Sequence, residues 1–157
     1  MPGNVWLPKL GEDHMHAETN SKVITPRVLD RSECLGLLRE TRFGRLAVSI
    51  PAQPPVIRPV HYLFDEPSQS VVIKSAHGSK LGALLRSQQA AFEIDGIDEE
   101  SASGWSVVIT GMTEEITSRP EIERIEASGL DPWAPGEHHT LVRIRAFTVT
   151  GRRILRG

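Results

Sequence analysis

The stretch WSVVITGMTEEIT, residues 105–117, decides the fold class of this chain. Its pattern predicts one long β-strand over Trp105–Thr117. Gly111 lies near the middle, where a glycine is typical of a β-bulge that lets a sheet bend sharply. A long strand that can bend suits a sheet that curls on itself.

Strand patterns dominate the rest of the chain as well. For example, Leu46, Val48 and Ile50 alternate with more polar positions, which is the period of a β-strand. The predicted strands are 45–50, 56–63, 70–75, 90–94, 105–117 and 140–149, with 151–155 as a continuation after a break, and 56–63 and 70–75 are expected to form a hairpin. The acidic stretch 95–103 is predicted to be a loop.

Three helices are predicted between these strands. The first begins at a capping box of Asp30 and Glu33 and ends at Gly44, the second covers 79–86, and the third runs from Ser118 and Glu121 to about Ala127. The predicted fold is therefore mainly β: six or seven antiparallel strands curled into a barrel, with two or three short helices.

Composition indicates one globular domain and excludes several classes of function. The chain has 157 residues, of which 39% are hydrophobic and 24% charged, and its formal charge of −2 disfavours nucleic-acid binding through a basic surface. The single cysteine, Cys34, excludes an internal disulfide, and the sequence has no apolar run of membrane-spanning length. We expect a flexible arm over 1–22 and one domain over 23–157, in the cytoplasm because no targeting signal is evident.

The stretch KSAHGSKL, residues 74–81, combines features that suit an anion. A strand ends, a Gly-Ser turn follows, and a helix begins, so that backbone N–H groups without intrahelical partners point outward. Gly78 permits close approach, Ser79 offers a hydroxyl and Lys80 a positive charge. The alternative is that Ser79 only caps the helix and Lys80 is solvated.

A second group, Arg58 and His61, lies in the strand before this turn. In a hairpin with 70–75, either side chain would approach the turn and add a second cation for a phosphate. The alternative is a surface arginine and a hydrogen-bonded histidine in the barrel.

Several short motifs, taken in order, resemble the pyridoxamine 5′-phosphate oxidase-like family. They are ECLGLL at 33–38, GRLA at 44–47, PVHY at 59–62, GSKL at 78–81, GWSV at 104–107 and Gly111. The resemblance runs from about Val28 to Arg153. It implies a flavin-reductase-type split β-barrel that forms a homodimer and holds flavin mononucleotide (FMN) in a groove between the subunits.

The resemblance also implies which residues hold the cofactor. In relatives of this kind the strand matching Arg58, Pro59, Val60 and His61 lies along the isoalloxazine ring, the positions of Lys74, Ser75, Gly78, Ser79 and Lys80 hold the ribityl chain and phosphate, and Trp105 and Ser106 are contributed by the partner subunit. Trp133 lies in a loop that would cover the site. No metal is implied, and no catalytic residue is assigned beyond His61 as a candidate proton donor.

The expected function is that of an FMN-dependent oxidoreductase acting on a small molecule. The oxidase's C-terminal Arg-Leu-His motif is absent, so pyridoxamine phosphate itself is not the expected substrate. Two alternatives remain: a deazaflavin-dependent reductase, and a non-catalytic module that binds flavin or haem.

Other polar and reactive residues are interpreted as structural. Loose histidines near 14–16 and 137–139 lack a scaffold for a metal site, and Cys34 lies on the apolar stripe of the first helix, where it is expected to pack. The arginines Arg143, Arg145, Arg152 and Arg153 form either a surface ladder or a lining for the partner's phosphate.

Overall fold

The computed structural model describes residues 24–49, 52, 54–76, 85, 89–131 and 139–156. Along the chain its elements are β1 (Ile24–Leu29), α1 (Arg31–Glu40), β2 (Phe43–Val48), β3 (Val56–His61), β4 (Leu63–Asp65), β5 (Ser70–Ala76), β6 (Gln89–Asp98), β7 (Ser103–Glu115), α3 (Arg119–Ala127) and β8 (His139–Arg156). The predicted helix over 79–86 falls almost entirely outside these residues. The same is true of residues 1–22, which were predicted to be a flexible N-terminal segment.

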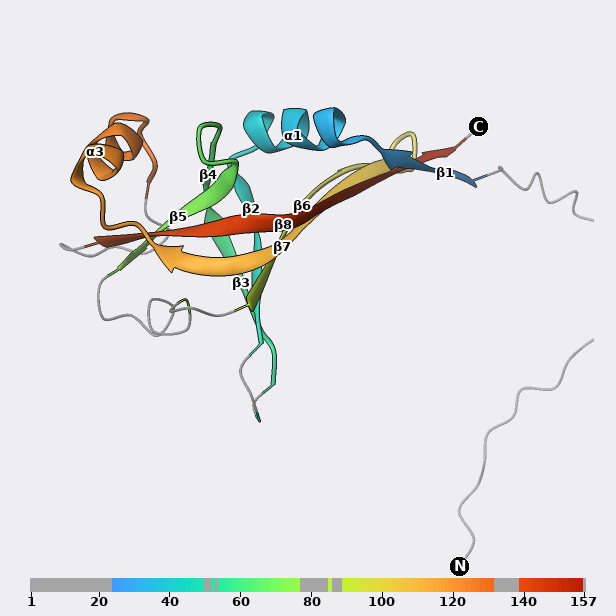
Figure 1. Cartoon of the computed structure of the whole chain (residues 1–157). Coiled ribbons are helices and arrows are strands. Elements are labelled where there is room, and N and C mark those ends of the chain that lie inside the picture. The colour runs from blue at the N-terminus through green and yellow to red at the C-terminus, as the bar shows by residue number, and fades with distance from the viewer. Residues whose placement is uncertain are drawn as a thin grey trace, which may run out of the picture.

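The strands form one curled antiparallel sheet, which confirms the predicted mainly β fold (Figure 1). Its order is β3-β2-β6-β7-β8-β5-β4, and β1 pairs with β8. The described residues form eight strands: β1, which contains Pro26, was not predicted, the predicted strand 56–63 is divided between β3 and β4, and 140–149 and 151–155 belong to the single strand β8. β6, β7, β8 and β1 extend together beyond the core. From here on, "the arm" means this extension of the sheet and not residues 1–22. α1 lies along the arm (Figure 1).

The start of α1 follows the predicted capping box. The Asp30 carboxylate accepts from the backbone N–H of Glu33 at 2.8 Å, and the Glu33 carboxylate accepts from the N–H of Asp30 at 2.9 Å. The predicted end at Gly44 is wrong, since the helix ends at Glu40 and Gly44 belongs to β2. A Cβ at Gly44 would lie 2.4 Å from the ring of Phe92, so this glycine serves core packing and not a helix cap.

The predicted bulge at Gly111 is confirmed. The pairing of β7 with β8 shifts between Thr110 and Gly111, and Phe147 is the additional residue on β8. A Cβ at Gly111 would lie only 1.9 Å from the carbonyl oxygen of Arg145, so only glycine lets the two backbones approach this closely. The bulge leaves the side chain of Phe147 68% exposed.

The predicted hairpin between 56–63 and 70–75 is wrong in part. β3 pairs with β2, and only the short β4 pairs with β5. Tyr62 separates β3 from β4: its N–H donates to the carbonyl of Arg42 at 3.0 Å and its buried hydroxyl donates to that of Leu38 at 2.9 Å. Burial raises the pKa of Tyr62 to about 12.

Two further strands are longer than predicted. β6 continues to Asp98, so the acidic stretch contributes to a hairpin with β7. β8 runs unbroken from His139 to Arg156, and Gly151 is needed inside it because a Cβ there would lie 2.6 Å from the sulfur of Cys34. The expected packing of Cys34 is confirmed: it is buried, and burial raises the pKa of its thiol.

The chain buries two apolar clusters on opposite faces of β5. Val71 and Ile73 belong to the main core, whereas Val72 packs with Ile125 of α3 in a smaller cluster. The predicted extent of α3 is close to that observed, although Ser118 makes no side-chain cap. No helix among the described residues is long and apolar enough to cross a membrane.

Candidate functional site

The predicted phosphate corner, Gly78-Ser79-Lys80, lies outside the described residues, as does the loop of Trp133. Its role therefore stays a prediction. The structure does describe the other predicted cofactor residues, which lie on β3, β5 and β7.

On β3, the predicted residues divide between the two faces of the sheet. Arg58 and Pro59 are exposed, Val60 is fully buried in the main core, and His61 is half-buried with its ring edge-on to Phe43 at 5.6 Å. Arg58 donates to the carbonyl of its neighbour Ile57 at 2.9 Å and makes no ion pair within the described part of the chain. Arg58 is thus a cation whose charge the described residues leave uncompensated.

On β5, the two predicted residues have different surroundings. Lys74 points toward α3, where its ammonium lies 3.7 Å from the carboxylate of Glu126. Ser75 is buried on the face of Ile73. Because β3 pairs with β2 and not with β5, strand pairing does not bring Arg58 beside this strand.

Three predicted residues share one face of the sheet, which we call the outer face. Cross-strand register places Pro59 beside Arg45 of β2, then Glu93 of β6, Val108 of β7 and Thr150 of β8. His61 and Ser106 lie on the same face, His61 two residues from Pro59 along β3 and Ser106 two residues from Val108 along β7. These positions, unlike the neighbouring core positions, are all at least partly exposed.

Charges on the outer face are distributed unevenly. Arg45 donates to the carboxylate of Asp95 and, at 3.4 Å, to that of Glu93, so both acids are paired. The hydrogen bond that Arg45 donates to Asp95 raises the pKa of Arg45. Arg152, which pairs in register with Ser106, makes no ion pair in the described residues. Arg45 offsets only one of the two carboxylates, so Arg152 brings the net charge of these four side chains to zero.

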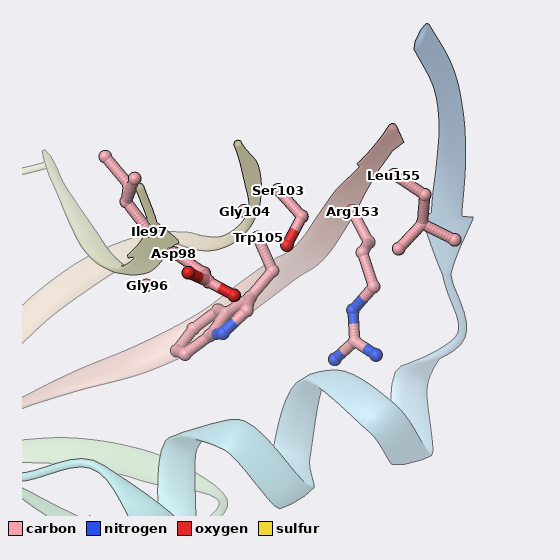
Figure 2. Close-up of a pocket in the computed structure, with 8 residues that line it drawn as sticks. All are labelled: Gly96, Ile97, Asp98, Ser103, Gly104, Trp105, Arg153 and Leu155. Carbon is pink, nitrogen blue, oxygen red and sulfur yellow. The ribbon is translucent and has the colours of Figure 1, made fainter. Parts of the chain in front are cut away.

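Two cavities flank the arm, one on each side of Trp105 and Ser106. On the outer face, a cavity of about 340 Å³ is lined by Ser106, Arg152 and Ile154 among others. A second, of about 290 Å³, is lined by Gly96, Ile97, Asp98, Ser103, Gly104, Trp105, Arg153 and Leu155 (Figure 2). Successive residues of a strand point to opposite faces, so Ser106 lines only the cavity on the outer face. Trp105 is large enough to line both cavities.

His61 lines another cavity, between β3 and the end of α3. Its volume is about 290 Å³, and Arg42, Tyr62, Ser128 and Asp131 also line it. The resemblance did not point to this cavity, because its walls come from segments far apart in the sequence.

An apolar cavity of about 400 Å³ lies on the outer face beside the bulge. Ala47, Ala91, Thr110 and Phe147 are among the residues that line it. Sequence reasoning missed it, although the predicted bulge at Gly111 was the available signal.

The interpretation of the arginines as a surface ladder or phosphate lining fails for Arg143. Its side chain is buried against α3, and its guanidinium donates to both carboxylate oxygens of Glu121 at 2.9 Å each. Arg145 is exposed and pairs with Glu114 at 3.1 Å. Among the described residues there is no cluster of three metal-ligating side chains.

Comparison with known proteins identifies the family. The model of the family described as pyridoxamine 5′-phosphate oxidase matches residues 30–153. The uncharacterized protein Rv0080 of Mycobacterium tuberculosis H37Rv is 33% identical over 132 residues, which cover 81% of this chain and 84% of that protein. A solved FAD-binding protein of Mycobacterium smegmatis has a TM-score of 0.70 at 26% identity, over 81% of this chain and 98% of the other. A conserved protein of unknown function, DIP1874 of Corynebacterium diphtheriae, has a TM-score of 0.69 at 30% identity, over 83% and 98%. Since the family model spans most of the chain, this protein belongs to the pyridoxamine 5′-phosphate oxidase family.

Proposed function

We propose that the protein is a flavin-dependent oxidoreductase that binds FMN between the outer faces of two copies of the chain. The observation that carries the proposal is that Pro59, His61 and Ser106 lie on the same exposed face, together with Arg152, which makes no ion pair in the described residues. The similarity to a protein described as FAD-binding supports a flavin.

The described residues fit such a cofactor. A flavin ring presents carbonyl and ring-nitrogen acceptors at its edge, and it needs donors there together with an apolar surface. Ser106 and Arg152 supply donors, and Val108 lies between their row and the apolar cavity. Glu93 and Asp95 would repel an anionic cofactor; Arg45 offsets one of these two negative charges and Arg152 the other.

A second copy explains how the predicted residues would act together. Ser106 lies two residues along β7, about 7 Å, from the row of Pro59, and three strand spacings, about 14 Å, separate β7 from β3. One chain thus keeps them apart, whereas a two-fold arrangement of outer faces would set the arm of one copy against β3 of the other. Phe147 and Ile57, which are 68% and 60% exposed, are the apolar side chains that such packing would cover.

When bound, the flavin supplies hydride transfer at its N5 atom. Ser106 and Arg152 of one copy would hold the edge of the ring, and His61 of the other is the candidate proton donor. Lys80 and Ser79 would hold the phosphate. Because the Arg-Leu-His motif is absent, a small molecule other than pyridoxamine phosphate is the proposed substrate.

The visible spectrum of the purified protein, followed by titration with FMN, tests the proposal. Flavin bands are the expected result; a Soret band would indicate haem, and a colourless protein that takes up no flavin would favour a deazaflavin or no cofactor. We expect Lys80→Ala to weaken FMN binding by about 1.5–3 kcal/mol, the range for a charge-assisted contact. Arg119→Ala, at a solvated position on α3, is the matched control and should bind FMN normally.

Sedimentation analysis tests the pairing of outer faces separately. Phe147→Ser should shift the protein from dimer toward monomer and lower its flavin affinity. Leu155→Ser removes a side chain of comparable exposure on the opposite face of β8 and should leave the dimer intact. A wild-type monomer that still binds FMN would refute the shared site.

A further inference from the structure

The cavity on the α1 side of the arm is built from an unusual set of groups. Figure 2 shows the indole of Trp105 and the guanidinium of Arg153 facing the same space, with Asp98 at the rim. We call it the arm pocket. The residues predicted for the flavin account for Trp105 but not for Arg153.

Two glycines are among the residues that line the arm pocket, and neither carries a side chain into it. Gly96 pairs with Trp105, and a Cβ there would lie 2.6 Å from the indole nitrogen. A Cβ at Gly104 would lie 3.1 Å from the carbonyl oxygen of Gly96. The indole of Trp105 therefore packs on the bare backbone of Gly96, and its partly exposed remainder lines the pocket, where stacking is a favourable contact for an aromatic ring.

Arg153 supplies a donor that the described residues do not use. Its Nε atom is buried and has no hydrogen-bond partner among them. The nearby carboxylate of Glu33 already accepts from Arg27 at 2.8 and 3.0 Å. An orphaned buried N–H is costly, and a bound acceptor would remove that cost.

Asp98 does not compete for Arg153 through a hydrogen bond. Its carboxylate accepts from the N–H groups of Glu100 and Ser101 at 3.1 and 3.3 Å and from the Ser101 hydroxyl at 2.6 Å. The hydrogen bonds from Ser101 hold the pKa of Asp98 below its usual range. Asp98 is therefore engaged in the turn between β6 and β7.

We propose that the arm pocket binds a planar aromatic carboxylate, with the ring against Trp105 and the carboxylate on the guanidinium of Arg153. The planar fork of arginine matches the two oxygens of a carboxylate. A volume of about 290 Å³ is at the lower end for ligand pockets, so it suits a small ring system and not a whole nucleotide cofactor. Binding of this ligand does not depend on the proposed flavin site, which lies on the outer face of the sheet.

The test uses nuclear magnetic resonance on the ¹⁵N-labelled full chain without added flavin. The indole N–H signal of Trp105 is identified by its loss in Trp105→Phe and is followed during titration with benzoate and with its neutral analogue benzamide. We expect a saturable shift with benzoate and at least about tenfold weaker binding of benzamide. No shift with benzoate, or equal affinity for both compounds, would overturn the proposal.

Variants assign the carboxylate contact. Arg153→Met should weaken benzoate binding by at least about tenfold, and Arg153→Lys, which keeps the charge but not the fork, should give an intermediate affinity. Arg145→Met, on an exposed position of the same strand, is the matched control and should bind as the wild type does. Unchanged affinity in both Arg153 variants would remove this residue from the site. Failure of the FMN titration with intact benzoate binding would instead refute the flavin assignment alone.

Discussion

Replacement of Gly111 by alanine tests the reasoning about the bulge most directly. The added Cβ would lie 1.9 Å from the carbonyl oxygen of Arg145 and 2.9 Å from its carbonyl carbon. Ordinary carbon–oxygen contacts are about 3.3 Å or longer. Both contacts are to backbone, so no side-chain rotation relieves them, and β7 and β8 must separate by more than about 1 Å.

The size of the effect follows from what that separation breaks. Overpacking of this kind costs about 1–3 kcal/mol, and loss of one or two hydrogen bonds next to the bulge adds about 1 kcal/mol each. We therefore expect Gly111→Ala to destabilise the fold by about 2–5 kcal/mol. Domains of this size are stable by only about 5–15 kcal/mol, so the loss is a large share of the total.

Urea unfolding followed by circular dichroism measures this difference. Gly36→Ala is the control: no atom lies within 4 Å of its added Cβ, and alanine in a helix should stabilise α1 by about 1 kcal/mol. The two alanines thus have opposite expected signs. A Gly111→Ala variant within 1 kcal/mol of wild type, with an unchanged dependence on urea, would show that the strands are not locked at this carbonyl.

Two further predictions concern buried ionisable groups. Burial raises the pKa of Tyr62 from 10.0 to about 12. The contribution of Tyr62 to the free energy of unfolding is therefore full below about pH 10, and it falls by about 2–3 kcal/mol as the pH rises to 12. Unfolding curves of Tyr62→Phe at alkaline pH should lack this decline. Burial alone would raise the pKa of Asp65, but hydrogen bonds from Arg124 and Ser68 outweigh burial and lower this pKa. The ionised Asp65 therefore stabilises the fold at neutral pH, and this stabilisation is lost in acid, below the unfolded pKa of about 3.9. Arg124→Met should cost about 1–2 kcal/mol at pH 7, a discounted figure because Arg124 is 45% exposed, and urea unfolding at pH 7 and pH 3 should show the difference shrinking in acid.

Sequence patterns predicted the features that neighbouring residues decide. The capping box of Asp30 and Glu33 joins groups three residues apart, and it formed as expected. The bulge needed only a glycine within a long strand. The role of Gly44 was not predictable in this way, because it comes from the ring of Phe92, forty-eight positions away, and no local pattern indicates such a contact.

The candidate site was harder to predict because it depends on which strands pair and on which face each residue points to. Adjacent strands usually pair, so the hairpin of 56–63 with 70–75 was a reasonable prediction. The buried hydroxyl of Tyr62 instead anchors the chain to α1 and separates β3 from β4. That separation places His61 with Ser106 on the outer face while Trp105 turns toward α1, a division that motif order alone does not contain.

The distribution of side chains between the two faces of the sheet also explains why we expect cofactor binding to depend on dimer formation in this protein. A sheet must cover its apolar face with another layer, and α1 and α3 cover the core side of β8 and the far side of β5. The outer face keeps small side chains, paired acids and the exposed ring of Phe147, and no described element covers it. If a second sheet supplies that layer, Arg152 is set against β3 of the other copy by the same contact that buries Phe147. Selection for a stable interface would then also preserve the cofactor site, which is why Phe147→Ser is expected to lower both dimer affinity and flavin affinity.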